Sequence, residues 1–354
     1  MNLSVNRYFP GGNTTKGFFS YYDMLQNKND LTDIYTIKGG PGVGKSTLMK
    51  KIGTIFEKDG CEVNYYHCSS DPYSLDGVHI PKKKILFVDG TSPHITDPKY
   101  PGAKHHLINL ADFLNTETLK KNSDKIIEIT DKISGLFSTA YCYLKATRPI
   151  YENLNKNYSN AFMGNQFNYL ISYLDEIITG GKTGNGYSEK KMFLSAITPY
   201  GFKNFLNETV KNKNVYILNS LTGDLTHKVT NNIKTRLELK NFKTESYYCP
   251  IDPDYKLEHL IIPELDTAII TSNKFHIFKN GEIINVSQIY NASLLNKEAI
   301  EYDEKIIDNL LNKSVNVISL AKSTHDILEE YYISAMDYLK LDSFFNKIIK
   351  SITT

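Results

Sequence analysis

One stretch combines closely spaced glycines with a lysine and two hydroxyl residues: Gly39, Gly40, Pro41, Gly42, Val43, Gly44, Lys45, Ser46 and Thr47. Glycines allow successive backbone N–H groups to turn inward around an anion, which suits the phosphates of a nucleoside triphosphate. In such a loop Lys45 would reach the β- and γ-phosphates, and the hydroxyl of Ser46 would ligate Mg²⁺. We therefore treat the whole stretch as a candidate nucleotide-binding loop and Lys45 as a candidate catalytic residue.

The residues on either side of this loop predict the elements that it requires. The apolar run Ile34–Ile37 leads into it and predicts a strand. Apolar residues at helical spacing follow it: Leu48, Met49, Ile52, Ile55 and Phe56. Strand, glycine loop and helix in this order form a P-loop, with the anion at the helix N-terminus.

Asp89 ends a second apolar run that begins at Ile85. An acid at the carboxyl end of a buried strand, downstream of a P-loop, is typical of the Walker B residue near the metal. We predict that Ser46 and Asp89 together hold Mg²⁺. The alternative interpretation is a strand that ends in an Asp-Gly turn.

Four more polar residues are candidates for the base or for binding an acceptor: His67, Asp71, Asp76 and His94. They follow predicted strands, and would lie within reach of a γ-phosphate if those strands run parallel to the P-loop strand. Turn formation is the alternative for Asp71, which precedes a proline, and for Asp76, which precedes a glycine. His67 could equally be a strand-end residue with a structural hydrogen bond.

Length and composition limit the classes of protein. A chain of 354 residues predicts about two domains, and a net charge of +2 gives no indication of nucleic acid or an anionic membrane as partner. Only Arg7, Arg148 and Arg236 could supply an arginine finger from within the chain. The four cysteines form no CxxC pair, and no stretch reaches the length of a membrane span. These features predict a cytoplasmic protein.

Long helices and a glycine-rich segment divide the chain. Apolar spacing predicts an amphipathic helix from Glu117, broken or kinked at Pro149, and a second helix over Tyr151–Ile178. The segment 179–190 is rich in glycine and predicts a linker. A second long helical pattern covers about 294–352.

The second half repeats the first. Tyr66 and Cys68 match Tyr247 and Cys249 at an offset of 181 residues. The same offset aligns Ser220–His227 with the glycine loop. In this alignment Thr226 corresponds to Lys45, and the acidic residue Asp224 lies within the segment that corresponds to the anion-binding loop. Asp89 aligns with Thr271. We expect a tandem duplication of an α/β P-loop unit with a doubly wound, mostly parallel sheet, each half followed by a long helical hairpin.

The expected organisation is an active half over 1–178, the linker 179–190 and a degenerate half over 191–354. The degenerate half would pack on the first as a pseudo-symmetric partner. We expect no triphosphate binding by the second half, because Asp224 would repel phosphate.

The chain resembles an uncharacterised bacterial family of P-loop ATPase-like proteins that contain two tandem P-loop halves. The strings that carry the resemblance are 9–18, 38–47, 67–71, 75–81 and 88–94, and the similarity spans nearly the whole chain. In that family the second half usually carries its own Gly-Lys-Ser/Thr loop, which this chain lacks. The resemblance implies ATP binding and hydrolysis, and it supplies no substrate.

Three functions remain open at this point. The first is a Mg²⁺-dependent ATPase whose turnover drives a conformational change. The second is a kinase that transfers the γ-phosphate to a small molecule or nucleotide, and the third is a nucleotide-sensing module. The sequence contains no Asn-Lys-x-Asp motif, which argues against a GTPase. Motor ATPases often carry a glutamate directly after the Walker B acid, but here that position is Gly90, so the group that activates water must come from elsewhere. The sequence favours the ATPase, with the base, the arginine finger and any protein partner or acceptor unidentified.

Overall fold

The computed structural model describes residues 5–26 and 30–353 and forms two compact units. Unit 1 comprises Met1–Pro10, Ser20–Thr139 and Asn316–Thr354, and unit 2 comprises Gly11–Phe19 and Ala140–Val315. Both units are of the α/β class, with sheets that mix parallel and antiparallel strands. Among the described residues, no helix is both long and apolar enough to cross a membrane.

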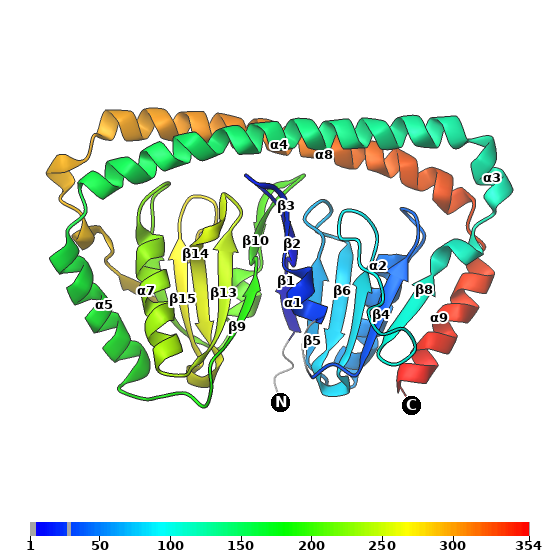
Figure 1. Cartoon of the computed structure of the whole chain (residues 1–354), viewed down its shortest axis with the longest axis horizontal. Coiled ribbons are helices and arrows are strands. Elements are labelled where there is room, and N and C mark those ends of the chain that lie inside the picture. The colour runs from blue at the N-terminus through cyan, green and yellow to red at the C-terminus, as the bar shows by residue number, and fades with distance from the viewer. Residues whose placement is uncertain (1–4, 27–29, 354) are drawn as a thin grey trace. The chain divides into compact units, whose positions relative to one another are not determined.

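Unit 1 is built on a six-stranded sheet (Figure 1). Its strands lie in the order β1 (Val5–Tyr8), β5 (Val63–His67), β6 (Leu75–Ile80), β7 (Ile85–Asp89), β4 (Asp33–Lys38) and β8 (His105–Asn109). The helices wholly within this unit are α1 (Tyr22–Gln26), α2 (Lys45–Lys58), α3 (Thr116–Lys121) and α9 (Tyr338–Thr353), with short 3₁₀ turns at Pro81–Lys83 and Leu110–Phe113. The apolar side chains of α2 and α9 share one core with the sheet.

The sheet of unit 1 is mixed: the pairs β1–β5, β4–β7 and β4–β8 are parallel, as expected for a mostly parallel sheet, but β6 runs antiparallel to both β5 and β7. Only the short segment between β5 and β6 is available to connect them, and a parallel connection needs a dozen or more residues. The chain therefore turns back directly after His67. The predicted strands at 34–37 and 85–89 are confirmed as β4 and β7, which pair in parallel.

Unit 2 contains a six-stranded sheet with the same order and the same pairing senses. Its strands are β9 (Ser188–Met192), β13 (Lys243–Cys249), β14 (Asp252–Ile262), β15 (Thr267–Ser272), β12 (Asn214–Asn219) and β16 (Glu282–Ile284). A further four-stranded sheet is formed by β11 (Gly201–Asn204), β10 (Ser195–Thr198), β2 (Gly11–Thr14) and β3 (Gly17–Ser20). The helices wholly within unit 2 are α5 (Gly164–Thr179), α6 (Leu206–Thr209) and α7 (Thr226–Leu239), and short 3₁₀ turns occur at Pro263–Leu265, Ser287–Ile289 and Ala292–Leu294.

Two helices of 38 residues each, α4 (Ser123–Asn160) and α8 (Lys297–Ser334), belong partly to each unit. Pro149 does not break the first of them, since α4 continues through Pro149 to Asn160. A proline in a helix loses one backbone hydrogen bond and crowds the preceding turn, and here the helix continues despite that cost.

The division into units differs from the predicted ranges. Residues 140–178 lie in unit 2 and residues 316–354 lie in unit 1, so neither half of the sequence keeps its own helical hairpin. A helix of this length extends about 57 Å, which exceeds what a small α/β unit can cover. The predicted linker 179–190 contains the end of α5 and the start of β9.

Candidate functional site

The glycine loop connects β4 to α2 in unit 1, as predicted. Gly42 and Gly44 have φ angles of +69° and +96°, a region that other residues rarely adopt, so both turns depend on glycine. Gly44 directly precedes α2 and places the first residues of the helix at the carboxyl end of β4. Thr47 lies on the exposed side of the first turn of α2.

The loop presents a row of backbone amides. Within the described chain, the N–H groups of Gly42, Val43, Gly44, Lys45 and Ser46 donate to no protein acceptor. The N-terminal end of a helix carries a partial positive charge as well, so amides in this arrangement favour an anion.

Lys45 lies across this row. Its Nζ donates to the carbonyl oxygens of Gly39 and Gly40 at 3.0 and 2.8 Å, and lies 3.6 Å from Oδ2 of Asp89. The side chains of Lys45 and Asp89 are both largely buried. The structure therefore brings together the two charged residues that the sequence predicted at this site.

Asp89 and Ser46 offer the oxygen atoms that a Mg²⁺ ion would need. Oδ1 of Asp89 accepts from the amide and the hydroxyl of Thr91, at 2.8 and 2.6 Å, which fixes the carboxylate and leaves Oδ2 toward Lys45. Oγ of Ser46 accepts from the amide of Leu75 at 2.9 Å. Carboxylate and hydroxyl oxygens suit a hard divalent cation, so these residues fit Mg²⁺.

Asp76 and His94 form a buried pair next to these groups. His94 Nε2 lies 3.5 Å from Oδ2 of Asp76, and the ring of Tyr22 stacks on His94. Burial by itself would raise the pKa of Asp76, but His94, Tyr22 and Cys68 hold it below its ordinary value. Burial would lower the pKa of His94, and Asp76 raises it above the ordinary value. Each group of the pair thus favours the charged form of the other.

His67 is held in place by contacts of both ring nitrogens within unit 1. Its Nδ1 bonds to the carbonyl oxygen of Pro72 at 2.8 Å, and its Nε2 lies 3.0 Å from the guanidinium of Arg7. Burial lowers its pKa to about 4, so the ring is neutral, with the proton on Nδ1. Both nitrogens are engaged, which favours the structural interpretation of His67.

Asp71 caps a turn and also binds a helix. Its carboxylate accepts from the amide of Tyr73 and the hydroxyl of Ser74, at 3.2 and 2.9 Å. The same carboxylate lies 3.6 Å from Nζ of Lys322, in α8. The turn interpretation thus applies to Asp71, with an ion pair added.

None of the three arginines is free of carboxylate or histidine partners. Arg7, in unit 1, bonds to His67 and lies over the ring of Tyr65. In unit 2, Arg148 binds Glu152 and Asp252, and Arg236 binds Asp175.

Sequence reasoning missed the residues that α8 brings to this site. A Cβ atom on Gly40 would lie 2.5 Å from the ring of Tyr332, and one on Gly42 would lie 3.2 Å from Cβ of Glu329. His325 and Glu329 form an i,i+4 pair on the same helix, with 3.6 Å between Nδ1 and Oε1. The spacing of His325, Asp326 and Glu329 was the available signal, but these residues lie almost 300 positions after the loop.

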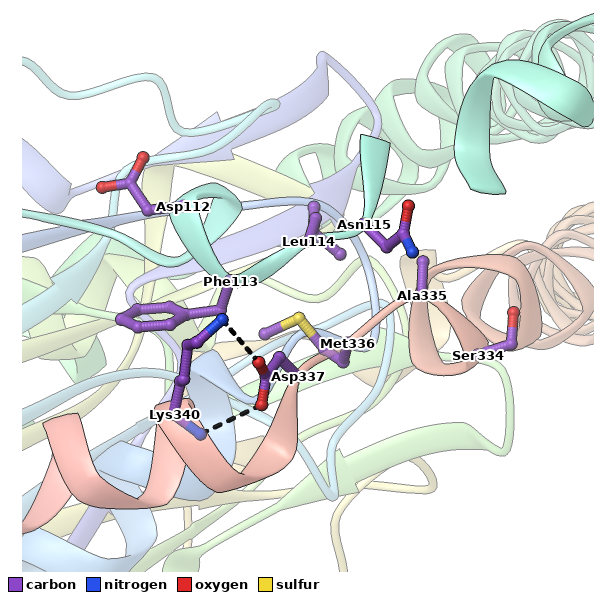
Figure 2. Close-up of a pocket in the computed structure, with 9 residues that line it drawn as sticks. All are labelled: Asp112, Phe113, Leu114, Asn115, Ser334, Ala335, Met336, Asp337 and Lys340. Atoms are coloured by element: carbon purple, nitrogen blue, oxygen red, sulfur yellow. Dashed lines mark hydrogen bonds and ion pairs between the residues drawn. The ribbon is translucent and has the colours of Figure 1, made fainter. Parts of the chain in front are cut away.

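A cavity of unit 1 lies away from these residues. It has a volume of about 420 Å³ and is lined by residues 112–115, which precede α3, and by residues at the turn between α8 and α9 (Figure 2). Two of its charged residues bind each other, because Asp337 accepts from the amide and from the ammonium of Lys340. None of the predicted site residues lines this cavity.

In the loop Ser220–His227 of unit 2, the side chain of Asp224 binds backbone amides of the same loop. The carboxylate of Asp224 accepts from the amides of Leu221 and Thr226 at 2.8 and 3.1 Å, and from the hydroxyls of Ser220 and Thr226. Asp224 is buried, and burial raises its pKa. An internal carboxylate thus takes the amides that a phosphate would need.

No family model, curated protein or solved structure matches the chain.

Proposed function

We propose that the protein binds ATP with Mg²⁺ at a single site in unit 1 and hydrolyses it. The observation that carries this proposal is the row of unpaired amides from Gly42 to Ser46, with the ammonium of Lys45 and the carboxylate of Asp89 beside it. Amides and a lysine recognise phosphate, and an acid with a serine hydroxyl recognises the metal. The glycine loop between a parallel strand and a helix supports the same interpretation.

In this proposal, different residues bind the phosphates and the metal ion. The loop amides and Lys45 hold the phosphate oxygens and stabilise the charge that develops on them. Ser46 and Asp89 hold Mg²⁺, which neutralises phosphate charge when bound. Thr91 fixes the Asp89 carboxylate, so that the acid does not need to reorient.

The same arrangement favours hydrolysis over transfer to an acceptor. A kinase would need polar side chains that are available to hold the acceptor hydroxyl. His67 and Asp71 are bonded within the protein, and Asp76 and His94 are buried against each other. The loop-borne residues that suggested a kinase are thus accounted for by structural contacts.

We also infer that the two units descend from a duplicated P-loop unit and that unit 2 has lost the phosphate site. Their sheets share strand order and pairing senses. Ion pairs recur as well: Asp71 with Lys322 in unit 1, and Asp252 with Arg148 in unit 2. Asp224 in the loop of unit 2 supports the loss of nucleotide binding there.

Phosphate release from ATP and Mg²⁺ by the purified protein tests the proposal, alone and with a pool of metabolites. We expect steady release without any acceptor. Lys45→Ala should lower it by about 10²–10³-fold, because a charged contact to the phosphates is lost. Lys51→Ala is the matched control, since Lys51 lies on the same helix and pairs at the surface with Asp342. Release that requires an acceptor and yields a phosphorylated product would support the kinase instead.

A further inference from the structure

The proposed reaction lacks an obvious residue to activate water. Motor ATPases often carry a glutamate after the Walker B acid, but a Cβ atom on Gly90 would lie 2.5 Å from Cγ2 of Thr36 and 2.9 Å from the carbonyl oxygen of Thr96. That position has no room for any side chain. The group that accepts the proton of water must come from another element.

The last three turns of α8 are the element that lies against the loop in unit 1. Tyr332, Ile333 and Glu329 are in contact distance of the Cβ positions of Gly40 and Gly42. Leu341 and Phe345 of α9 pack under Gly44 and anchor this end of the chain in the core of unit 1. Both α8 and α9 therefore pack against the glycine loop.

His325 is the titratable group of α8 that combines suitable chemistry with a suitable position. Its Nδ1 faces Oε1 of Glu329, so the carboxylate can hold the ring and stabilise it when protonated. The other nitrogen, Nε2, is left to accept a proton. The side chain of His325 is 39% exposed, which leaves it accessible to water.

The charges around His325 favour the neutral ring that a base requires. Burial lowers its pKa, and the ammonium groups of Lys322 on α8 and Lys45 on α2 lower it further, against the opposing effect of Glu329 and Asp326. His325 lies between Lys322, which pairs with Asp71, and Glu329, which contacts the Cβ position of Gly42, at the i, i+3 and i+4 spacing of one helix face. The imidazole therefore lies on the face of α8 that packs against the glycine loop.

We propose that His325 is the general base of the ATPase site and that Glu329 is its positioning residue, an inference that rests on the proposed function. The oxygen of a water molecule attacks the γ-phosphorus while the bond from that phosphorus to the β,γ-bridging oxygen breaks, releasing ADP. The proton of the water passes to Nε2 of His325 and from there to solvent.

The test separates binding from turnover. ATP binding is measured by calorimetry, and phosphate release by a single-turnover assay with Mg²⁺. His325→Gln should retain ATP affinity within about threefold and lose about 10²–10⁴-fold in the rate of release. Glu330→Gln is the matched control, because Glu330 is the exposed neighbour of Glu329 on the same helix and should keep the wild-type rate.

The pH profile gives a second readout. The wild-type rate should rise with pH through a pKa below 6.5, the ordinary value for histidine, and then level off, as the ring loses its proton. Glu329→Gln removes the larger of the two charges that raise this pKa, so the rise should move to lower pH, with a smaller loss of rate than in His325→Gln.

The outcomes also separate this inference from the proposed function. A wild-type protein that binds no ATP overturns the proposed function. A protein that binds ATP in a Lys45-dependent manner, while His325→Gln releases phosphate at the wild-type rate, overturns the role of His325 alone. ATP binding without any release by the wild type overturns both hydrolysis and the base, and leaves nucleotide binding intact.

Discussion

At the scale of the residue, the two glycine-type loops differ in what their amides bind. In unit 1 the amides from Gly42 to Ser46 remain available, and in unit 2 Asp224 accepts from those of Leu221 and Thr226. A buried amide without an acceptor costs free energy, so a loop that loses its phosphate ligand gains from an internal carboxylate. A single acid can thus close an anion site without changing the fold around it.

The close packing around Gly90 predicts that any side chain at this position lowers the stability of the protein. Gly90→Ala places a methyl group against Thr36 and Thr96, and should lower the free energy of unfolding by about 1–3 kcal/mol. Gly135→Ala is the control, because its Cβ would meet nothing within 4 Å in α4. Alanine at that helical position should raise stability by about 0.5–1 kcal/mol. Urea unfolding measures both, and equal effects of the two substitutions would contradict the packing argument.

The Asp76–His94 pair predicts a pH dependence of stability. The pKa of His94 is raised above 6.5 in the folded protein, so its contribution is complete below pH 6.5 and is lost as the pH rises through the folded pKa. The pKa of Asp76 is lowered below 3.8, so its contribution is present above pH 3.8 and is lost as the pH falls through the folded pKa. The pair therefore stabilises most in the weakly acidic range between these limits.

His94→Gln tests this dependence by urea unfolding from about pH 5 to about pH 9. The loss of stability should be about 3–5 kcal/mol near pH 6, because Asp76 stays buried without its partner, and should shrink toward alkaline pH. His106→Gln is the control, since His106 pairs with Asp33 in a more exposed position. A loss that does not vary with pH would show that the pair is not charged.

At the scale of the element, the helix α9 belongs to unit 1, the unit that contains the glycine loop. Phe345 and Leu341 of α9 lie against Gly44 and share the core with α2. The ion pair between Asp71 and Lys322 adds a second connection between the first sheet and α8. The elements that would bind phosphate thus depend on residues from the other end of the chain.

Phe345→Ala tests that dependence. Removing a fully buried aromatic side chain should cost about 3–5 kcal/mol of stability and weaken ATP binding, because Gly44 loses its support. Leu339→Ala is the control on the same helix, since Leu339 is 87% exposed, and it should change stability by less than about 0.5 kcal/mol. Unfolding in urea and calorimetry with ATP provide the two measurements. If both variants behave alike, α9 does not support the loop.

At the scale of the whole molecule, two units with one sheet topology carry different loops. The expected result is one ATP per chain. Isothermal titration should give a stoichiometry near one for the wild type and no binding for Lys45→Ala, because Asp224 already occupies the second loop. A stoichiometry of two, or binding that persists in Lys45→Ala, would contradict the assignment of unit 2 as inactive.

The sequence by itself determined the local features of the candidate site. The order of apolar run, glycines and helix formers fixed β4, the loop and α2, because each depends on residues that are neighbours in the chain. The same holds for β7 and its terminal Asp89. The offset of 181 residues also aligned Asp224 with the glycine loop, and the structure places this acid in the loop before α7.

Only the tertiary structure decided which distant segments meet. The sense of β6, the passage of α4 through Pro149 and the assignment of α9 to unit 1 all depend on contacts between residues far apart in the sequence. Helical periodicity predicts a buried face but does not say what covers it. His325 and Glu329 are far from Lys45 in the sequence, and only the packing of α8 against the glycine loop relates them to this site.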